Sequence, residues 1–287
     1  MTTMKSKFSQ ALTSGRLVLT AECVPPRMAT SKEIKDLSNA LAPSLDAIVV
    51  ADNPDDVYGS ALACAGMLAQ EGRTSILSMV TRDRNRVALQ SDAMGAYSLG
   101  VSGILCLSGN HQSMGVCREA AGACDIDSIQ LTKMLKNLEL PEMALGEVAH
   151  PYQTPLELNI IRLKKKVAAG ADFVMTEPVF DLAGFETWME AVRQAGLDKQ
   201  TAIIASILPV TSADQAHFLQ DRKTYGPIDE DLIDLLTNGA DAVKIGLEKA
   251  AEIASKVKAV PGVRGIHILC GGNEAVSTDL IAAAKLA

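Results

Sequence analysis

Short apolar runs alternate with longer amphipathic stretches along the chain. Runs of this kind, bounded by turn residues and separated by helical stretches, are typical of parallel strands that are buried on both faces. The pattern predicts strands at residues 17–22, 46–51, 74–80, 103–107, 143–148, 173–176, 202–207 and 265–269. The intervening stretches predict helices at residues 4–14, 31–42, 58–70, 86–99, 128–139, 155–170, 184–195, 212–221, 229–238, 241–258 and 274–286.

Eight strands that alternate with helices in 287 residues predict an α/β protein with the (β/α)8 TIM-barrel fold. No repeat, linker or low-complexity segment divides the sequence, so we expect a single catalytic domain over residues 1–287. A doubly wound open sheet is the alternative fold. The fingerprint G-x-G-x-x-G does not follow the first strand, which counts against the usual dinucleotide-binding form of that alternative.

The predicted strands end in polar residues, although their bodies are apolar. In a TIM barrel the active site lies at the carboxyl ends of the strands, so these residues are expected to meet around one pocket. The polar strand ends are Glu22, Asp52-Asn53, Thr81-Arg82-Asp83, Ser108-Gly109-Asn110, His150, Thr176-Glu177 and Thr211.

The first strand ends in a carboxylate that is followed closely by two prolines. The stretch is LVLTAECVPPR, with Glu22 at the end of the strand and Pro25-Pro26 in the turn. Each proline fixes its own φ and biases the preceding residue toward extended backbone, so Glu22 is expected to be held firmly and aimed into a cleft. The alternative is that Glu22 caps the turn or pairs with Arg27.

Three other features have a functional and a structural interpretation. Gly109 allows the backbone to approach a ligand closely, or it is a plain turn glycine. His150 precedes a proline in a loop, where a histidine is commonly just solvated. The run Lys164–Lys166 is typical of an exposed helix face, although one of these lysines could turn inward toward a phosphate.

Composition narrows the class of protein. Aromatic residues make up only 3% and the formal net charge is −7, which argues against a nucleic-acid partner. The six cysteines form no C-x-x-C pair and no cluster with metal-ligand spacing, so we expect free thiols, a reducing compartment and no metal. The amino-terminal residues lack an apolar signal segment, and no apolar run is long enough to span a membrane. We therefore expect a cytoplasmic protein.

Several motifs, taken together and in order, resemble the methylenetetrahydrofolate reductase family. The resemblance runs from Ala21 to Asn273. The matching motifs are ECVPPR at 22–27, LSGN at 107–110, LKKKVAAGAD at 163–172, TEPVFD at 176–181, ILPV at 207–210 with Gln215, and VRGIHI at 263–268.

The resemblance implies a flavoenzyme of one-carbon metabolism. It implies that FAD lies across the strand ends and carries hydride from NAD(P)H, or from a partner electron-transfer protein, to 5,10-methylenetetrahydrofolate, giving 5-methyltetrahydrofolate. The general acid would fall on Glu22. Flavin contacts would fall on Ala51, Met79, Ser108, Gly109, Asn110, Asp127, Ser128, His150, Asn159 and Lys166. Substrate contacts would fall on Asn110, Glu177 and Gln215.

Some positions depart from the pattern that is frequent in the family. The family often has Arg-Gly-Asp at Ser108–Asn110, threonine at Ala51, histidine at Met79, tyrosine at Gly146 and glutamine at Glu177. We interpret Asn110 and Glu177 as a swap that keeps one carboxylate for the N–H-rich edge of the pterin. Two alternative functions stay open: a folate-binding barrel that acts in methyl transfer with a corrinoid partner, and a non-catalytic partner subunit. A homo-oligomer is expected, with a methyltransferase as an optional partner.

Overall fold

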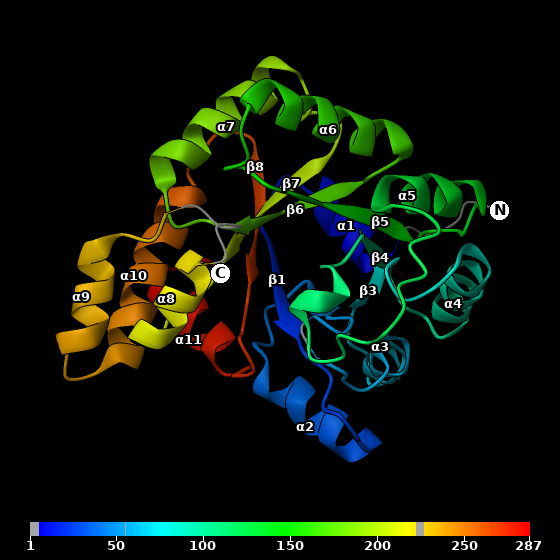
Figure 1. The fold of residues 1–287 in the computed structure, drawn as a ribbon, viewed down its shortest axis with the longest axis horizontal. Coiled ribbons are helices and arrows are strands. Elements are labelled where there is room, and N and C mark those ends of the chain that lie inside the picture. Colours follow the sequence, from blue (N-terminus) through cyan, green and yellow to red (C-terminus); the bar gives the residue numbers. More distant parts are fainter. Residues whose placement is uncertain (1–5, 55, 222–226) are drawn as a thin grey trace.

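The eight strands close into a parallel barrel in sequence order, and the last strand pairs with the first (Figure 1). The computed structural model describes residues 6–54, 56–221 and 227–287. The strands are β1 (Val18–Cys23), β2 (Ala47–Val50), β3 (Ser75–Val80), β4 (Gly103–Leu107), β5 (Ala144–Ala149), β6 (Phe173–Pro178), β7 (Ala202–Ile207) and β8 (Val263–Ile268).

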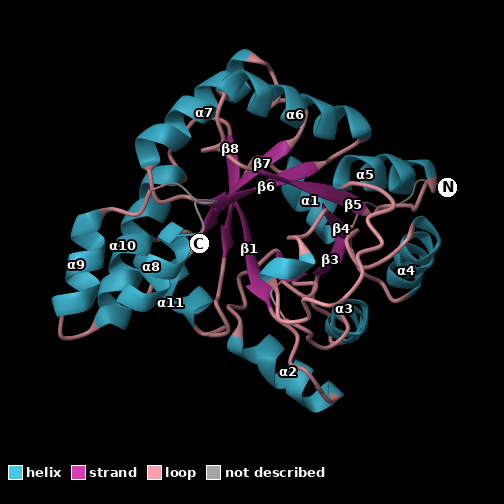
Figure 2. Ribbon diagram, viewed as in Figure 1, coloured by secondary structure: helices cyan, strands magenta, loops and turns pink. Residues whose placement is uncertain are grey.

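Helices surround the barrel, as Figure 2 shows. They are α1 (Lys7–Thr13), α2 (Ser31–Ala40), α3 (Ala61–Gln70), α4 (Arg86–Ser98), α5 (Ser128–Asn137), α6 (Leu156–Ala169), α7 (Leu182–Gln194), α8 (Ala213–Asp221), α9 (Glu230–Asn238), α10 (Ala242–Val257) and α11 (Val276–Ala283). A short 3-10 helix, η1 (Gln112–Met114), lies in the loop between β4 and α5.

The predicted TIM barrel is confirmed, and the open-sheet alternative is wrong because β1 and β8 pair in parallel from Val18–Gly265 to Ala21–Ile268. The element bounds differ from the predicted ones at a few ends. Strand β6 continues through Pro178, so Glu177 lies inside the strand. Helix α3 begins at Ala61, because the Ser60 side chain accepts a hydrogen bond from the Ala63 N–H and caps the helix there.

An apolar layer fills the amino-terminal half of the barrel. Helix α1 inserts Phe8, Ala11 and Leu12 among the strand side chains, and the Phe8 ring meets Phe173 edge-on at 5.2 Å between centroids. The layer above is polar, and its buried members are Thr20, Ser78, Thr176, Ser206 and His267. The change from apolar to polar along the barrel axis leaves a polar floor under the carboxyl ends of the strands.

Candidate functional site

A cavity of about 380 Å³ opens at the carboxyl ends of the strands, and every strand contributes to its wall. This volume lies within the roughly 300–1,000 Å³ of small-molecule sites. Its apolar wall includes Val49, Val80, Leu105, Leu107, Val148, Met175 and Leu269. Its polar lining includes Glu22, Arg82, Asn110, Glu147, His150, Lys166, Glu177 and His267. The predicted site residues that line the cavity are Glu22, Ala51, Ser108, Gly109, Asn110, Ser128, His150, Lys166 and Glu177.

Four of the predicted site residues lie outside this lining. Met79 is fully buried in the core between the barrel and its helices. Asp127 caps α5 by accepting a hydrogen bond from the Gln130 N–H at 2.7 Å. Gln215 accepts one from the Thr211 N–H at 2.9 Å. The Asn159 amide donates to the carbonyl oxygen of His150. The contacts of these four side chains hold neighbouring segments in place.

Glu22 reaches the cavity from β1, where it stands beside Val49 in the parallel register. Arg27, the alternative partner for Glu22, binds the Asp56 carboxylate through its guanidinium. Glu22 also lies close to Cys270, where burial raises the pKa of the thiol and the Glu22 charge adds to that rise. The side chain is half-buried at the end of an apolar strand, as the sequence predicts.

His267 belongs to the floor of the cavity. Its Nδ1 lies 2.9 Å from the Thr20 hydroxyl oxygen, and burial lowers the pKa of its imidazole to about 4. The ring is therefore neutral at pH 7. Sequence reasoning missed this residue as a site residue, because it lies within β8 and not at the polar end of the strand.

Glu177 and His150 meet on the far side of the mouth. Glu177 Oε1 lies 2.6 Å from His150 Nδ1, while Glu177 Oε2 is buried without a hydrogen-bond partner. The short contact occupies His150 Nδ1, so Glu177 Oε2 is the atom of this pair that keeps its bonding capacity. Asn159 fixes the loop that carries His150, and it accepts a hydrogen bond from the Trp188 indole at 3.2 Å.

A buried carboxylate, Glu147 of β5, lines one arm of the cavity and was not predicted. Glu147 is 0% exposed, and its Oε1 accepts a hydrogen bond from the Thr132 hydroxyl at 2.9 Å. Its Oε2 lies 3.3 Å from Lys166 Nζ. Burial raises the pKa of the Glu147 carboxyl, and the Lys166 charge opposes that rise. An acidic residue interrupting the apolar run at 143–148 was the available sequence signal.

Arg82 joins the loops that surround the mouth. Its guanidinium donates to the carbonyl oxygens of Asn110 at 3.0 Å and Asn53 at 3.2 Å, and to the Asp83 carboxylate. Gly109, beside it, has φ +80°, and a Cβ there would lie 2.5 Å from Val80 Cγ1. Position 109 therefore requires glycine for both its backbone conformation and its space.

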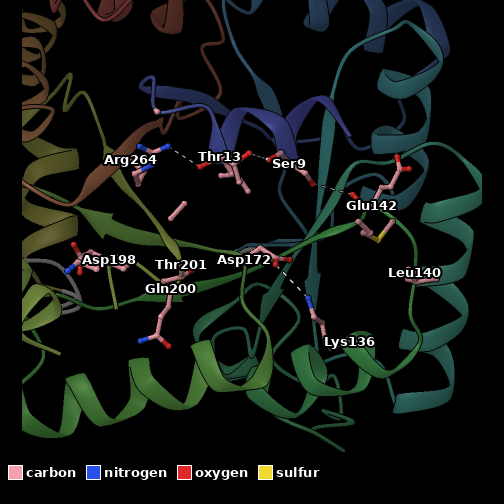
Figure 3. A pocket seen from close by; sticks show the side chains of 15 residues that line it. Ser9, Thr13, Lys136, Leu140, Glu142, Asp172, Asp198, Gln200, Thr201 and Arg264 are labelled. Atoms are coloured by element: carbon pink, nitrogen blue, oxygen red, sulfur yellow. Dashed lines mark hydrogen bonds and ion pairs between the residues drawn. The ribbon is translucent and has the colours of Figure 1, made fainter. Parts of the chain in front are cut away.

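A larger cavity, about 790 Å³, lies at the opposite end of the barrel beside α1 (Figure 3). Its side chains connect elements at that end: Arg264 donates to the Leu12 carbonyl oxygen at 3.0 Å, and Lys136 lies 3.6 Å from Asp172. Active sites of TIM barrels occur at the carboxyl face, and the amino-terminal face serves stability. We therefore place the candidate site in the smaller cavity.

In the part of the chain that the structure describes, no three His, Cys, Asp or Glu side chains are grouped so that they could hold a metal ion. No helix among these residues combines the length and the apolar character that crossing a bilayer requires.

The closed barrel and the polar cavity at its carboxyl ends define a (β/α)8 barrel of the enzyme type. A model of the methylenetetrahydrofolate reductase family matches residues 7–285. The chain belongs to this family, which confirms the resemblance seen in the motifs.

Named relatives agree with that assignment. The 5,10-methylenetetrahydrofolate reductase of Salmonella typhimurium is 24% identical over 217 residues, which cover 74% of this chain and 71% of that enzyme. Methylenetetrahydrofolate reductase 2 of Saccharomyces cerevisiae is 30% identical over 154 residues, or 50% of this chain, and the match spans only 24% of the yeast protein.

Solved structures share the fold at low sequence identity. A Clostridium thermocellum protein, described as binding two copies of 5-methyl-5,6,7,8-tetrahydrofolic acid, has a TM-score of 0.69 at 12% identity, covering 97% of this chain and 99% of that one. Oxaloacetate acetylhydrolase has a TM-score of 0.56 at 12% identity, covering 95% of this chain and 82% of that one. These likenesses concern the fold.

Proposed function

We propose that this protein interconverts 5,10-methylenetetrahydrofolate and 5-methyltetrahydrofolate by hydride transfer, with a flavin bound in the carboxyl-end cavity and Glu22 as general acid. The observation that carries the proposal is the meeting of Glu22 and Glu177 around one cavity in a barrel of this family. The methyltetrahydrofolate described for the Clostridium thermocellum barrel supports a folate as the substrate.

The lining suits flat heterocycles with polar edges. Apolar side chains such as Val80 and Leu107 offer surfaces for a ring, and Gly109 lets the backbone approach it. Two buried carboxylate oxygens on the lining accept no hydrogen bond: Glu147 Oε2 and Glu177 Oε2. Buried polar atoms are normally satisfied, so these two point to a ligand that donates hydrogen bonds.

A flavin, when bound, supplies hydride transfer between a reduced nicotinamide and the one-carbon unit. The protein's own contribution to folate chemistry is Glu22, which donates a proton to the substrate nitrogen as the methylene bridge opens. A positioned general acid contributes roughly 10²–10⁴-fold to such a step. The mouth of the barrel keeps Glu22 and the reacting carbon in one partly desolvated space.

Glu177 is proposed to recognise the pterin. Its free Oε2 can accept a hydrogen bond from the N–H-rich pterin edge, and the contact with His150 keeps the carboxylate turned toward the cavity. Asn110, held by Arg82 through its carbonyl oxygen, stands on the same rim. A carboxylate on this edge agrees with the proposed exchange of acidic positions between residues 110 and 177.

Anaerobic absorption spectroscopy tests the proposal. The purified protein should show a flavin's visible absorption, which a reduced nicotinamide bleaches and methylenetetrahydrofolate restores. Glu22→Gln should keep the bleaching step and slow the restoring step by roughly 10²–10⁴-fold. Glu248→Gln, which changes an exposed carboxylate on α10, is the matched control and should leave both steps unchanged. A colourless protein that binds methyltetrahydrofolate would instead favour the methyl-transfer function.

A further inference from the structure

One arm of the cavity runs between the barrel and its helices. It lies at the ends of β4 and β5, facing α5 and α6, and is lined by Cys106, Ser108, Ser128, Glu147 and Lys166. The Ser108 hydroxyl oxygen accepts a hydrogen bond from the Ser128 N–H at 3.2 Å, which joins the end of β4 to the start of α5. The arm therefore has hydroxyl groups, one carboxylate and one ammonium group.

The carboxylate and the ammonium group of the arm balance each other. Of the lysines at 164–166, Lys166 turns inward, and its side chain is only 14% exposed. Its Nζ donates to the Val148 carbonyl oxygen at 2.5 Å and lies 3.3 Å from Glu147 Oε2. An ammonium group has three N–H donors, so Lys166 keeps donor capacity toward the arm. Glu147 Oε2 is ion-paired with Lys166 but accepts no hydrogen bond, so it keeps acceptor capacity.

The Arg82 guanidinium and the His150 imidazole, which also line the cavity, each have a carboxylate close by. Arg82 lies 2.8 Å from the Asp83 carboxylate, and His150 lies 2.6 Å from Glu177. Among the described lining residues, Lys166, Arg82 and His150 thus each stand beside a carboxylate, whereas His267 is neutral. A phosphate entering this lining would meet a carboxylate beside every cation.

The distance between Glu147 and Lys166 decides which ligand groups the arm favours. Opposite charges a few ångströms apart largely cancel at the position of a third group, and an incoming phosphate must also lose its water. A neutral group loses less water and can use both partners, since it accepts from Lys166 and donates to Glu147 Oε2. Without the Glu147 carboxylate, Lys166 would instead bind an anion in the ordinary way.

We propose that Glu147 is a specificity-determining residue, which makes the Lys166 arm accept a neutral group with adjacent hydrogen-bond donors and acceptors and reject a phosphate. The inference rests on the proposed function for the ring-binding part of the cavity. Two sources offer such a group: the hydroxyl chain attached to a flavin ring and the carboxamide of a nicotinamide. The resemblance counts Lys166 among the flavin contacts; under this proposal the flavin phosphates lie away from Lys166.

Calorimetric titrations of inorganic pyrophosphate into the wild-type protein and Glu147→Gln test the inference directly. The substitution keeps the shape of the side chain and removes the charge that opposes Lys166. We expect pyrophosphate to bind Glu147→Gln at least about tenfold more tightly than wild type, and the gain to disappear in Glu147→Gln/Lys166→Gln. Asp172→Asn is the matched control, because it removes the carboxylate beside Lys136 at the opposite end of the barrel.

Flavin titrations then identify the neutral group. The affinity for FAD should rise at least about tenfold in Glu147→Gln, relative to the affinity for riboflavin, which lacks phosphate. If riboflavin competes with pyrophosphate for Glu147→Gln and nicotinamide does not, the arm binds the hydroxyl chain. The reverse result assigns the arm to the carboxamide. Glu147→Asp keeps the charge but moves it away from Lys166, so it should show a smaller gain in affinity. This variant replaces Glu147→Gln in the test if Glu147→Gln does not fold.

Unchanged or weaker binding of pyrophosphate in both Glu147 variants would overturn the inference and would leave Glu147 as a residue that only joins β5 to α6. That result is separate from a failure of the proposed function. If the wild-type protein binds no flavin, the proposed function is wrong. The pyrophosphate comparison still decides the role of Glu147 in that case.

Discussion

Single polar side chains inside apolar strands place ionisable groups in the buried part of the cavity lining. Glu147 and His267 lie in the bodies of β5 and β8, and both are almost completely buried. Burial acts on them in opposite directions: it raises the pKa of the Glu147 carboxyl and lowers that of the His267 imidazole, because it disfavours the charged form in each case.

His267 should make the protein less stable in mild acid. Its pKa falls from 6.5 to about 4 on folding, so between these values the unfolded chain binds the extra proton and the stability rises with pH. Above pH 6.5 the imidazole is neutral in both states and the stability is unaffected. As the pH falls to 4, protonation of the unfolded chain lowers the free energy of unfolding by about 3 kcal/mol, at 1.4 kcal/mol per pKa unit. Urea unfolding at pH 7 and pH 5 should show about 2 kcal/mol of this difference, because pH 5 still lies above the folded pKa.

The matched variant for this effect is His267→Asn, which can still hydrogen-bond to Thr20 but does not titrate. Its stability should depend less on pH than that of the wild type in the same range. Glu22 and Glu147 are present in both proteins, so the difference isolates His267. Equal pH dependence in the two proteins would contradict the assignment of a buried neutral imidazole.

Glu177 should determine much of the folate affinity. Glu177→Gln replaces the free carboxylate oxygen and weakens a charge-assisted hydrogen bond, which is worth about 1.5–3 kcal/mol. We expect methyltetrahydrofolate to bind roughly 10–100-fold more weakly, as equilibrium titration would measure. Affinity equal to that of the wild type would refute the proposed exchange of acidic positions between 110 and 177.

At the scale of elements, a glycine in β5 leaves the space that an aromatic ring of β6 fills. A Cβ at Gly146 would lie 2.2 Å from the Phe173 ring, which is fully buried against Phe8 of α1. Gly146→Ala should therefore destabilise the protein by about 1–3 kcal/mol, the usual effect of overpacking. Denaturant unfolding measures the change.

The matched control for this prediction is Gly95→Ala in α4. A Cβ there meets only Leu62, at 3.6 Å, which is ordinary contact distance. Because alanine is a better helix former than glycine, this variant should be neutral or more stable by up to about 1 kcal/mol. Similar losses in both variants would argue against the specific crowding at Phe173.

For the whole molecule, α1 closes the amino-terminal end of the barrel. Phe8 is 0% exposed and packs in the layer that includes Phe173 and Ile204. Phe8→Ala should lower the free energy of unfolding by about 3–5 kcal/mol through the cavity it leaves. Tyr97→Ala, at a 46% exposed position on α4, is the aromatic control and should change stability far less. Comparable denaturation midpoints for the two variants would contradict the closing role of α1.

Much of the architecture was predictable from local pattern. The strands are apolar runs between turn residues, and the Asp127 cap marks where α5 begins, whereas the Ser60 cap of α3 was not recognised and the predicted start of that helix was too early. The polar strand ends and the motif around Glu22 predicted a pocket at the carboxyl face, and a polar-lined cavity lies there. These features are readable because periodicity, capping and turns depend on residues that are close in sequence.

The tertiary structure alone decided which groups pair across the barrel. Thr20 with His267, and Glu147 with Lys166, are partners only because parallel strands and their helices close into one ring. Closure also turned Met79 and Asn159 away from the cavity lining and brought Glu147 onto it. The sequence determined the barrel and Glu22 as a candidate acid; long-range packing, which sets burial and charge balance, determined the shape and polarity of the site.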